Sequence, residues 1–416
     1  MFISILVIIF FIVLIKVLGT NRAFFIYFVY NYIDLGYLFV GPVTTETVVL
    51  GIFVIDYLNS HIRNNREKYI FTYCSVLYIV SYIMSTAMSD NPHWPMTFVS
   101  LFNILIPPYL MFYYIQKKED LVFLISGIKY FVFFLFVYSI LELLIGTSPI
   151  VNFINTHNGT GYNLDTTFRY GIKRIQGTFT HATSFGYFTT VILSFLVLYL
   201  QPTIRKFNIS KIEYALLFTS LVIITLLTGT RSAIVPLFII LIYNWYVMPH
   251  KTIHIITAIV LLVTIILYDN GIIKFVNDVY ASIIDTDTNS VGSSKSMRET
   301  QWEIAKEYMM SNFWLGYGFG TTFEVVTVNR SDMFGAESIW FPTMIDRGFI
   351  GCMSYLTIYI ESLICLGKKF IRTFIFLSML LFMNSATSTP SVIESFLLCM
   401  VVIIYKYQKF TKNVKA

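Results

Sequence analysis

Residues 121–146 read LVFLISGIKYFVFFLFVYSILELLIG, an apolar run in which Lys129 and Glu142 are the charged residues. A run of this length can cross about 30 Å of hydrocarbon as one α-helix. Similar runs recur along the chain, and 12% of its 416 residues are charged, against about 25% in a soluble domain. The sequence therefore predicts an all-α integral membrane protein and excludes a β-barrel, whose strands are short and alternate in polarity.

The apolar runs predict about thirteen spans. They cover residues 2–18, 23–40, 44–59, 69–88, 96–116, 121–146, 182–200, 211–228, 231–248, 252–269, 338–366, 371–386 and 389–406. The second and third runs contain Asp34, Glu46 and Asp56. One of them could be re-entrant, which would give about twelve spans.

Basic residues follow every second predicted span, for example Lys117 and Lys118 after the fifth and Lys368 and Lys369 after the eleventh. Such clusters mark cytoplasmic loops. The C-terminus is therefore predicted to be cytoplasmic, and the N-terminus lies outside with thirteen spans or inside with twelve. The net charge of +6 comes mostly from these loops and does not indicate nucleic-acid binding.

This topology divides the chain into five regions. Residues 1–146 hold the N-terminal transmembrane helices, 147–181 a first external loop, 182–269 the central helices, 270–337 a large external loop, and 338–416 the C-terminal helices with a cytoplasmic tail. Residues that could carry chemistry concentrate in the two external loops and at the ends of the neighbouring spans.

The first external loop ends in the sequence Arg174-Ile-Gln-Gly177-Thr-Phe-Thr-His181 and leads directly into a span, with Arg169 and Lys173 close by. Basic residues on the outer face oppose the usual charge bias. They could bind an anionic group at headgroup depth, such as a lipid phosphate, or their side chains could extend to lipid headgroups without a specific role. His181 could be a base, or it could be structural.

A short external turn, Thr228-Gly-Thr-Arg231, joins two predicted spans. An arginine so close to hydrocarbon is costly, and it is normally functional or paired. Asp346, Arg347 and Glu394 are further charged residues within predicted spans. Some of these residues could simply pair with one another.

The large external loop contains a predicted amphipathic helix. Ser296 and Glu299 form a capping-box pattern at its start, and Trp302, Ala305 and Met309 share one face. Arg298 in its first turn could point at an anionic ligand or lie at the surface, since a positive charge at a helix N-terminus is otherwise unfavourable.

Gly316-x-Gly318-x-Gly320 follows this helix. It is not a dinucleotide-binding fingerprint, which requires a preceding strand and a following helix. The glycines could form a tight turn or allow the backbone to approach a ligand closely. Histidines and acidic residues do not converge at the spacing that a metal site requires, and the sequence predicts neither a metal nor a cofactor.

The ordered motifs around Arg174–His181, Thr228–Arg231 and Arg298–Gly351 resemble the O-antigen polymerase/ligase superfamily over about residues 170–365. The resemblance implies a GT-C-like glycosyltransferase of the bacterial inner membrane that uses undecaprenyl-diphosphate-linked oligosaccharides. Arg174, Arg231 and Arg298 would then face the diphosphate. Membrane lipids and a chain-length regulator protein are further expected partners, and nucleic acid is not.

The resemblance assigns roles to eight residues. The catalytic candidates are Glu337, Arg298 and Arg174, and the substrate-binding candidates are Arg169, Arg231, His181, Arg347 and Gly318. One position departs from the pattern, because ligase-type members usually carry a histidine, often His-Asn, where this chain has Glu337-Ser338. The departure favours a polymerase that joins repeat units and leaves the identity of the general base open.

Two other functions fit parts of the sequence. A ligase of the same superfamily would transfer to a different acceptor, and a flippase or other transporter of lipid-linked oligosaccharides would form no new bond. A transporter commonly shows repeated halves, which we do not see, and transport would not explain the large external loop. The sequence does not distinguish O-antigen from capsule or exopolysaccharide as the product, and it does not identify the sugars.

Overall fold

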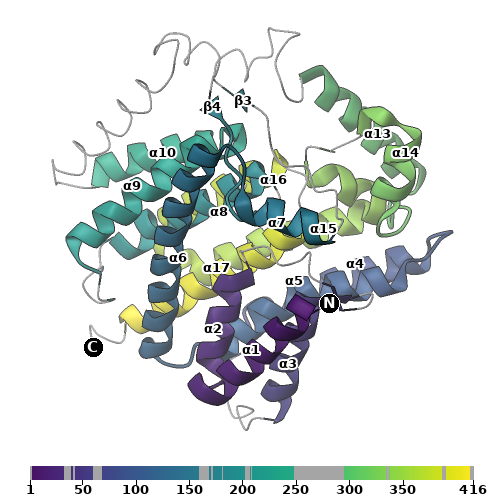
Figure 1. The fold of residues 1–416 in the computed structure, drawn as a ribbon. Coiled ribbons are helices and arrows are strands. Elements are labelled where there is room, and N and C mark those ends of the chain that lie inside the picture. The colour runs from purple at the N-terminus through teal and green to yellow at the C-terminus, as the bar shows by residue number, and fades with distance from the viewer. Residues whose placement is uncertain are drawn as a thin grey trace. The chain divides into compact units, whose positions relative to one another are not determined.

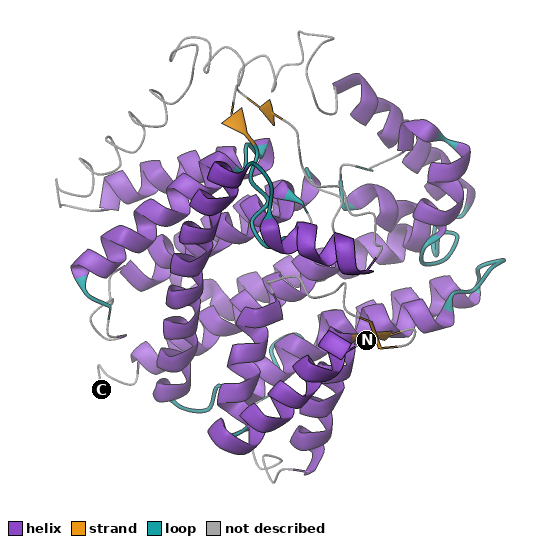
Figure 2. Ribbon diagram, viewed as in Figure 1, coloured by secondary structure: helices purple, strands orange, loops and turns teal. Residues whose placement is uncertain are grey.

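The computed structural model describes residues 2–31, 39–40, 43–59, 68–158, 168–169, 172–179, 181–201, 207, 209–247, 295–333, 336, 338–386 and 390–412. Within this part the chain is helical apart from two hairpins of two-residue strands (Figure 2). It forms two compact units: unit 1 comprises Met1–Ile52 and Gln116–Asp287, and unit 2 comprises Phe53–Ile115 and Thr288–Ala416.

Unit 1 is built around α8, which is apolar on all sides. Its helices are α1 (Phe2–Leu18), α2 (Thr20–Tyr30), the first half of α3 (Thr45–Asn59), α6 (Lys118–Ile145), α7 (Pro149–Asn158), α8 (Ala182–Phe195) with its π-helical extension η4 (Leu196–Leu200), α9 (Lys211–Leu227) and α10 (Arg231–Val247). All residues from Phe185 to Leu200 are buried, as expected for a helix without a polar face. Helices α9 and α10, teal like α8 in Figure 1, pack against it.

Two antiparallel hairpins accompany the helices of unit 1. In the first, β1 (Phe39–Val40) pairs with β2 (Val43–Thr44). In the second, β3 (Phe168–Arg169) pairs with β4 (Ile172–Lys173). The second hairpin lies in the predicted first external loop and delivers the chain to Arg174.

Unit 2 contains two closely packed helix pairs, α4 with α15 and α5 with α17. Its elements are α4 (Thr72–Ala87), α5 (Trp94–Tyr114), α13 (Lys295–Ser311), η6 (Thr322–Val326), α14 (Thr327–Asn329), η7 (Ser331–Met333), α15 (Trp340–Leu366), η8 (Gly367–Lys369), α16 (Phe370–Ser385) and α17 (Pro390–Lys412). The glutamate Glu361 fastens the first pair, because its carboxylate oxygens accept the backbone N–H groups of Tyr73 and Cys74 at 3.0 Å each.

Four helices in the described part are long and apolar enough to cross a membrane: α5, α6, α8 with η4, and α15. Shorter apolar helices occur at residues 4–18, in α4, in α10 and in α16. The prediction of an all-α integral membrane protein is thus confirmed, and most helix bounds fall within a few residues of the predicted spans.

The second predicted span was wrong as a continuous helix. Helix α2 ends at Tyr30 after eleven residues, about half the length that a spanning helix needs, and Phe39 and Val40 belong to a hairpin. Helix α7 lies in the segment predicted to be the first external loop, where no helix was predicted. The predicted span 252–269 lies outside the described residues.

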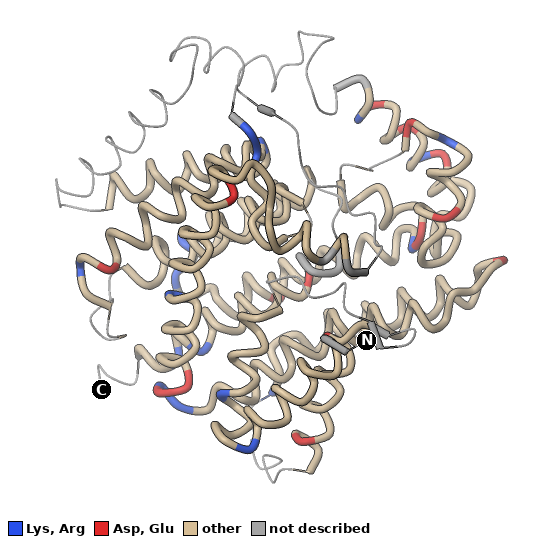
Figure 3. The backbone as a smooth tube through the Cα atoms, viewed as in Figure 1, with Lys and Arg blue, Asp and Glu red and all other residues tan. Residues whose placement is uncertain are grey.

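Charged residues gather on α13 and the segment that follows it, whereas the helices of unit 1 carry few (Figure 3). Ion pairs within the described part of this region include the following two. Arg330 Nη2 lies 3.0 Å from Glu307 Oε2, and Lys306 Nζ lies 3.8 Å from Glu303 Oε2. The distribution fits the prediction that this segment leaves the hydrocarbon.

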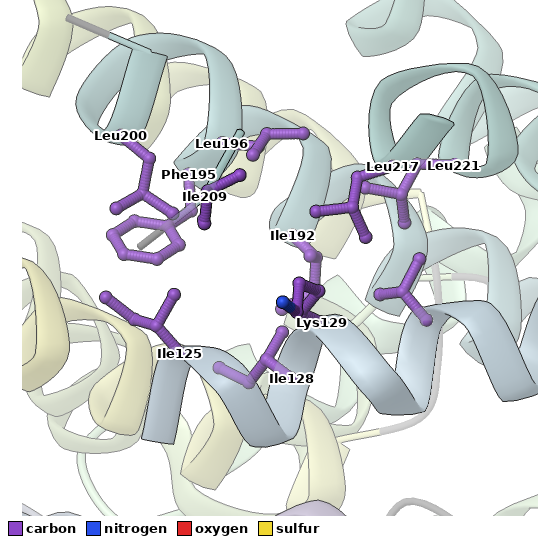
Figure 4. A pocket seen from close by; sticks show the side chains of 11 residues that line it. Ile125, Ile128, Lys129, Ile192, Phe195, Leu196, Leu200, Ile209, Leu217 and Leu221 are labelled. Carbon is purple, nitrogen blue, oxygen red and sulfur yellow. The ribbon is translucent and has the colours of Figure 1, made fainter. Parts of the chain in front are cut away.

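A small pocket in unit 1 lies between α6, η4 and α9 (Figure 4). Its lining is apolar except for Lys129: Ile125, Ile128, Lys129, Val132, Ile192, Phe195, Leu196, Leu200, Ile209, Leu217 and Leu221. The ammonium of Lys129 pairs with Glu213 Oε1 at 2.8 Å. Such a lining suits an apolar group and offers little to a sugar.

Candidate functional site

The first candidate region centres on Arg174, which the fold buries to 4% exposure. Its Nε donates to the carbonyl oxygen of Thr228 at 2.8 Å, and its Nη2 donates to the hydroxyl of Thr230 at 3.3 Å. The neighbouring Ile175 N–H donates to the carbonyl of Leu227 at 3.2 Å. Two motifs that lie more than fifty residues apart in the sequence are thus brought into direct contact.

The loop after Arg174 is held by Glu142 of α6. The carboxylate of Glu142 accepts the backbone N–H groups of Gln176 and Gly177 at 2.9 and 2.8 Å. Gly177 has φ +61°, and Ser148 donates to its carbonyl at 2.7 Å. A buried carboxylate is stable when several N–H groups satisfy it. Glu142 therefore fixes the position from which Arg174 reaches the Thr228–Thr230 turn.

Close packing at the start of α8 completes this region. A Cβ atom added at Gly186 would lie 2.8 Å from the Thr228 hydroxyl and 3.1 Å from Thr230 Cβ. Only a glycine lets α8 approach the turn so closely. The backbone positions around Arg174 are thus determined from three sides, by α6, by α8 and by the α9–α10 turn.

His181 is exposed and caps the N-terminus of α8. Its Nδ1 accepts the backbone N–H of Thr183 at 3.1 Å. A neutral imidazole with an accepting Nδ1 carries its proton on Nε2. The nitrogen that could take a proton is therefore already occupied by the cap, which favours the structural interpretation of His181 over that of a base.

Arg231 is the half-buried first residue of α10. It follows Gly229, whose φ of +59° makes the turn possible. A cation at a helix N-terminus is stabilised by a nearby negative group, and an anionic ligand is one group of this kind. Arg169 ends β3, but its side chain lies outside the described residues, as does Glu337.

The second candidate region, in unit 2, contains Arg298, Gly318 and Arg347. Helix α13 begins at Lys295, so Ser296 stands in its first turn and not at the predicted N-cap. Arg298 is exposed on that first turn. The opposite face of α13 packs on α15 through Ile304, Ala305 and partly buried Met309. The predicted helix with a buried apolar face is thus confirmed, but Trp302, which was predicted on that face, is 46% exposed.

The glycine turn docks on α15 through its backbone. The N–H groups of Tyr317 and Gly318 donate to the carbonyls of Ile345 and Asp346 at 2.9 Å each. A Cβ at Gly316 would lie 2.5 Å from the carbonyl oxygen of Ile345, and one at Gly318 would lie 2.4 Å from Ser89 Cβ. The close approach of Gly316 and Gly318 is made to protein atoms, which supports the tight-turn interpretation of the motif.

Helix α15 kinks at Gly348 to receive this turn. Gly348 has φ +57° and ψ −152°, a combination that glycine alone adopts without large strain. The next residue, Phe349, donates its N–H to the carbonyl of Phe313 at 2.8 Å. Gly348 of the Arg347-Gly-x-x-Gly351 motif therefore allows α15 to pack closely against the glycine turn.

Asp346 secures the far end of the glycine turn. Its Oδ1 accepts the N–H and hydroxyl of Thr322 at 2.8 and 2.7 Å, and its Oδ2 accepts the N–H of Gly320 at 3.1 Å. In the sequence, Asp346 is a charged residue inside a predicted span, to which no role was assigned. A carboxylate in an apolar run is costly, and this cost indicates that Asp346 has a role.

Arg347 is 3% exposed. Its guanidinium carbon lies 4.3 Å from the ring centre of Tyr82 and 5.4 Å from that of Tyr78. Nη2 donates to Thr343 at 3.2 Å, and Nη1 has no hydrogen-bond partner among the described residues. Glu394 of α17, buried at 0% exposure, interacts with this guanidinium electrostatically.

The candidate residues thus fall into two groups. Arg174, His181 and Arg231 belong to unit 1, and Arg298, Gly318 and Arg347 belong to unit 2. Among the described residues, no group of three or more His, Cys, Asp and Glu side chains is arranged to hold a metal ion.

Residues 215–356 match a family model described as O-antigen ligase. The matched segment includes the turn before Arg231, the helix α13 with Arg298, and the junction of the glycine turn with α15. It does not include Arg174 or His181. No curated protein matches the chain.

Proposed function

We propose that the chain is a member of the O-antigen polymerase/ligase superfamily, which the match over residues 215–356 supports, and that it is a polymerase that joins undecaprenyl-diphosphate-linked oligosaccharide repeat units into a surface polysaccharide, O-antigen or capsule. The reaction would take place at the outer face of the bacterial cytoplasmic membrane. One observation carries the choice of polymerase: Glu337-Ser338 stands where ligase-type members usually carry a histidine.

The proposed chemistry needs charge stabilisation more than covalent catalysis. The acceptor hydroxyl attacks the anomeric carbon of the donor sugar, the bond from that carbon to the diphosphate oxygen breaks, and the hydroxyl proton passes to a base. Arginines suit the developing charge on the diphosphate because the guanidinium is planar and always charged. The buried position of Arg174 beside the Thr228–Thr230 turn supports a preorganised role for it.

Arg298 and Arg231 are each proposed to contact donor diphosphate. Both stand at the start of a helix, Arg298 exposed and Arg231 half-buried, and a cation there gains from a bound anion. Arg169, Arg347 and Gly318 were predicted to bind substrate as well. The contacts of Gly318 and Arg347 within unit 2 favour a supporting role for these two.

The ligase is the second candidate, because the matching family model is described as O-antigen ligase. Product length separates the two. The purified full chain, given a lipid-linked repeat unit, should produce a ladder of increasing length if it is a polymerase. Single transfer to a different acceptor would identify a ligase, and the absence of any new glycosidic bond would contradict both.

Glu337 is the proposed general base, and a structural partner of an arginine is the alternative. If it is the base, Glu337→Gln should lower turnover by about 10²–10⁴-fold while binding of the lipid donor persists. If it is structural, glutamine should cost little turnover and Glu337→Lys should mainly lower the amount of folded protein. Near-normal polymerisation by purified Glu337→Gln would eliminate the base assignment.

A further inference from the structure

Several side chains of unit 2 retain polar atoms without a hydrogen-bond partner among the described residues, and four of them are grouped. The atoms of these four are the hydroxyl of Tyr78, Nη1 of Arg347, Oδ1 of Asn384 and both carboxylate oxygens of Glu394. The four residues come from α4, α15, α16 and α17, and their exposed fractions are 0%, 3%, 0% and 0%. We call these four residues the polar cluster.

The members of the polar cluster are neighbours. The guanidinium of Arg347 lies against the ring of Tyr78, and Glu394 interacts electrostatically with Arg347 and faces the hydroxyl of Tyr78. Asn384 donates to the hydroxyl of Tyr359 at 2.7 Å, and Tyr359 in turn interacts with Glu394. The unsatisfied atoms therefore belong to one connected group of side chains.

Burying polar atoms without hydrogen bonds costs free energy, because a buried charge loses its contacts with water and gains no protein contacts in their place. The same unit shows how a buried carboxylate is normally accommodated. Both oxygens of Glu361 accept backbone N–H groups at 3.0 Å. Glu394 lacks such partners, and a buried polar group of this kind inside a span indicates a function.

The donors and acceptors among these atoms indicate which kind of ligand the polar cluster could bind. Arg347 and Tyr78 offer N–H and O–H donors, whereas Glu394 and Asn384 offer acceptors. An anion would be repelled by Glu394 and a cation by Arg347. A hydroxyl group can donate to the carboxylate and accept from the guanidinium at the same time, and so can a water molecule.

The polar cluster also lies near helix ends. Arg347 stands seven residues after the first residue of α15, and Glu394 stands four residues after the first residue of α17. The loop charges assign these ends to the outer face of the membrane, where the proposed reaction takes place. A hydroxyl-bearing substrate would arrive on this side.

We propose that the polar cluster is a hydroxyl-binding site in which Glu394 accepts from, and Arg347 and Tyr78 donate to, a hydroxyl group of a sugar or a water molecule. That the hydroxyl belongs to a sugar rests on the proposed function. Whether the hydroxyl comes from a sugar or from water, Glu394 and Arg347 bind it, and this role is separate from the diphosphate contacts proposed for Arg174, Arg231 and Arg298.

The test measures lipid binding by the purified full chain with two probes, undecaprenyl diphosphate that carries the repeat unit and undecaprenyl diphosphate alone. Glu394→Leu keeps a similar volume and removes both acceptors. We expect it to weaken binding of the sugar-bearing probe about 10- to 100-fold, the effect of losing a hydrogen bond to a charged group, and to leave binding of the bare probe unchanged. Glu361→Gln is the matched control and should change neither.

A second measurement separates the sources. If both affinities are unchanged in Glu394→Leu, density from electron cryo-microscopy of the wild type should show ordered water among the four side chains that is missing from the variant. Unchanged affinities together with empty space between these side chains in the wild type would overturn the proposal. Glu394→Gln, which keeps one acceptor, provides the same readouts if Glu394→Leu does not accumulate.

The outcomes also distinguish this proposal from the proposed function. A wild-type protein that binds neither probe would contradict the polymerase, whereas ordered water in the polar cluster would still support a hydroxyl-binding site. A wild-type protein that forms polymer but shows neither effect would contradict the hydroxyl-binding site alone.

Discussion

Two buried arginines, Arg174 in unit 1 and Arg347 in unit 2, have opposite surroundings. Arg174 donates from Nε and Nη2 to Thr228 and Thr230, and Glu142 satisfies the N–H groups of the loop that follows it. Arg347 rests on the rings of Tyr82 and Tyr78 and keeps Nη1 unbonded within the described part of the chain.

The difference shows what each arginine does for the fold. The bonds of Arg174 hold the loop to the α9–α10 turn, so this part of unit 1 is determined by internal hydrogen bonds. Around Arg347 the backbone is determined by glycines, because Gly316 and Gly348 let the glycine turn meet α15 at contact distance. The guanidinium of Arg347 is not needed to hold this junction, so its Nη1 can donate a hydrogen bond to a bound molecule.

The largest expected effect tests the glycine junction beside Arg347. In Gly348→Ala the new Cβ would lie 2.7 Å from the backbone atoms Gly316 N and Phe313 O, at a φ of +57°. Backbone cannot move aside as a side chain can, so we expect a loss of about 3 kcal/mol or more in the free energy of unfolding. Thermal unfolding of the purified protein and its abundance in membranes provide the measurement.

Two controls sharpen this test. Gly177→Ala beside Arg174 also has a positive φ, but its Cβ would meet the ring of Phe185 at 2.7 Å, and a side chain can turn, so the loss should be smaller. Gly367→Ala meets nothing within 4 Å and should stay within about 0.5 kcal/mol of the wild type. Equal losses at Gly348 and Gly367 would contradict the proposed role of the junction.

An intermediate effect is expected from Arg174→Ala. The substitution removes the donors to Thr228 and Thr230, and we expect a loss of about 2–4 kcal/mol in the free energy of unfolding together with loss of polymer. Arg174→Lys keeps the charge but not the planar fork, so it should recover part of both. Thermal unfolding and product length on gels are the readouts, and an Arg174→Ala protein as stable as the wild type would refute the fastening role.

The smallest effect on stability is expected from Arg298→Ala, because Arg298 is exposed. Its free energy of unfolding should change by less than about 0.5 kcal/mol, while polymer should be lost if Arg298 contacts the donor diphosphate. Arg330→Ala is the matched control, since Arg330 is also exposed in unit 2 and pairs with Glu307 at 3.0 Å. Full-length polymer from Arg298→Ala would remove diphosphate binding from its role.

The sequence located most helices because their signal is local. Helix α1 coincides with the predicted span 2–18, and α9 and α10 end within one residue of their predicted ends, since apolar length and flanking charge are visible in a short window. The amphipathic pattern likewise predicted α13. Helix α2 was predicted too long, because its apolar run continues beyond Tyr30 into a segment where Phe39 and Val40 pair as a strand.

The candidate site was predictable in part. The resemblance picked out the motifs of Arg174 and Thr228 separately, and the structure adds that Arg174 donates to the Thr228 carbonyl. The role of Glu142 was not predicted, because its partners lie about 35 residues further along the chain. For the glycine motif, the sequence allowed either a tight turn or a close approach to a ligand. The structure supports the tight turn, because the glycines approach atoms of α15 and Ser89.

The amino-acid sequence alone determined that this protein is a helical membrane protein and where most of its helices begin and end, because both follow from the solvation of consecutive residues. Which buried charges are satisfied and which are not was decided only by the tertiary structure. Glu361 and Glu394 are alike in sequence, each a glutamate inside an apolar run. Within the described part of the chain, however, Glu361 accepts two N–H groups and Glu394 accepts none. The physical reason is that a hydrogen bond depends on which atoms of other helices arrive within about 3 Å, and spacing along one chain does not specify that.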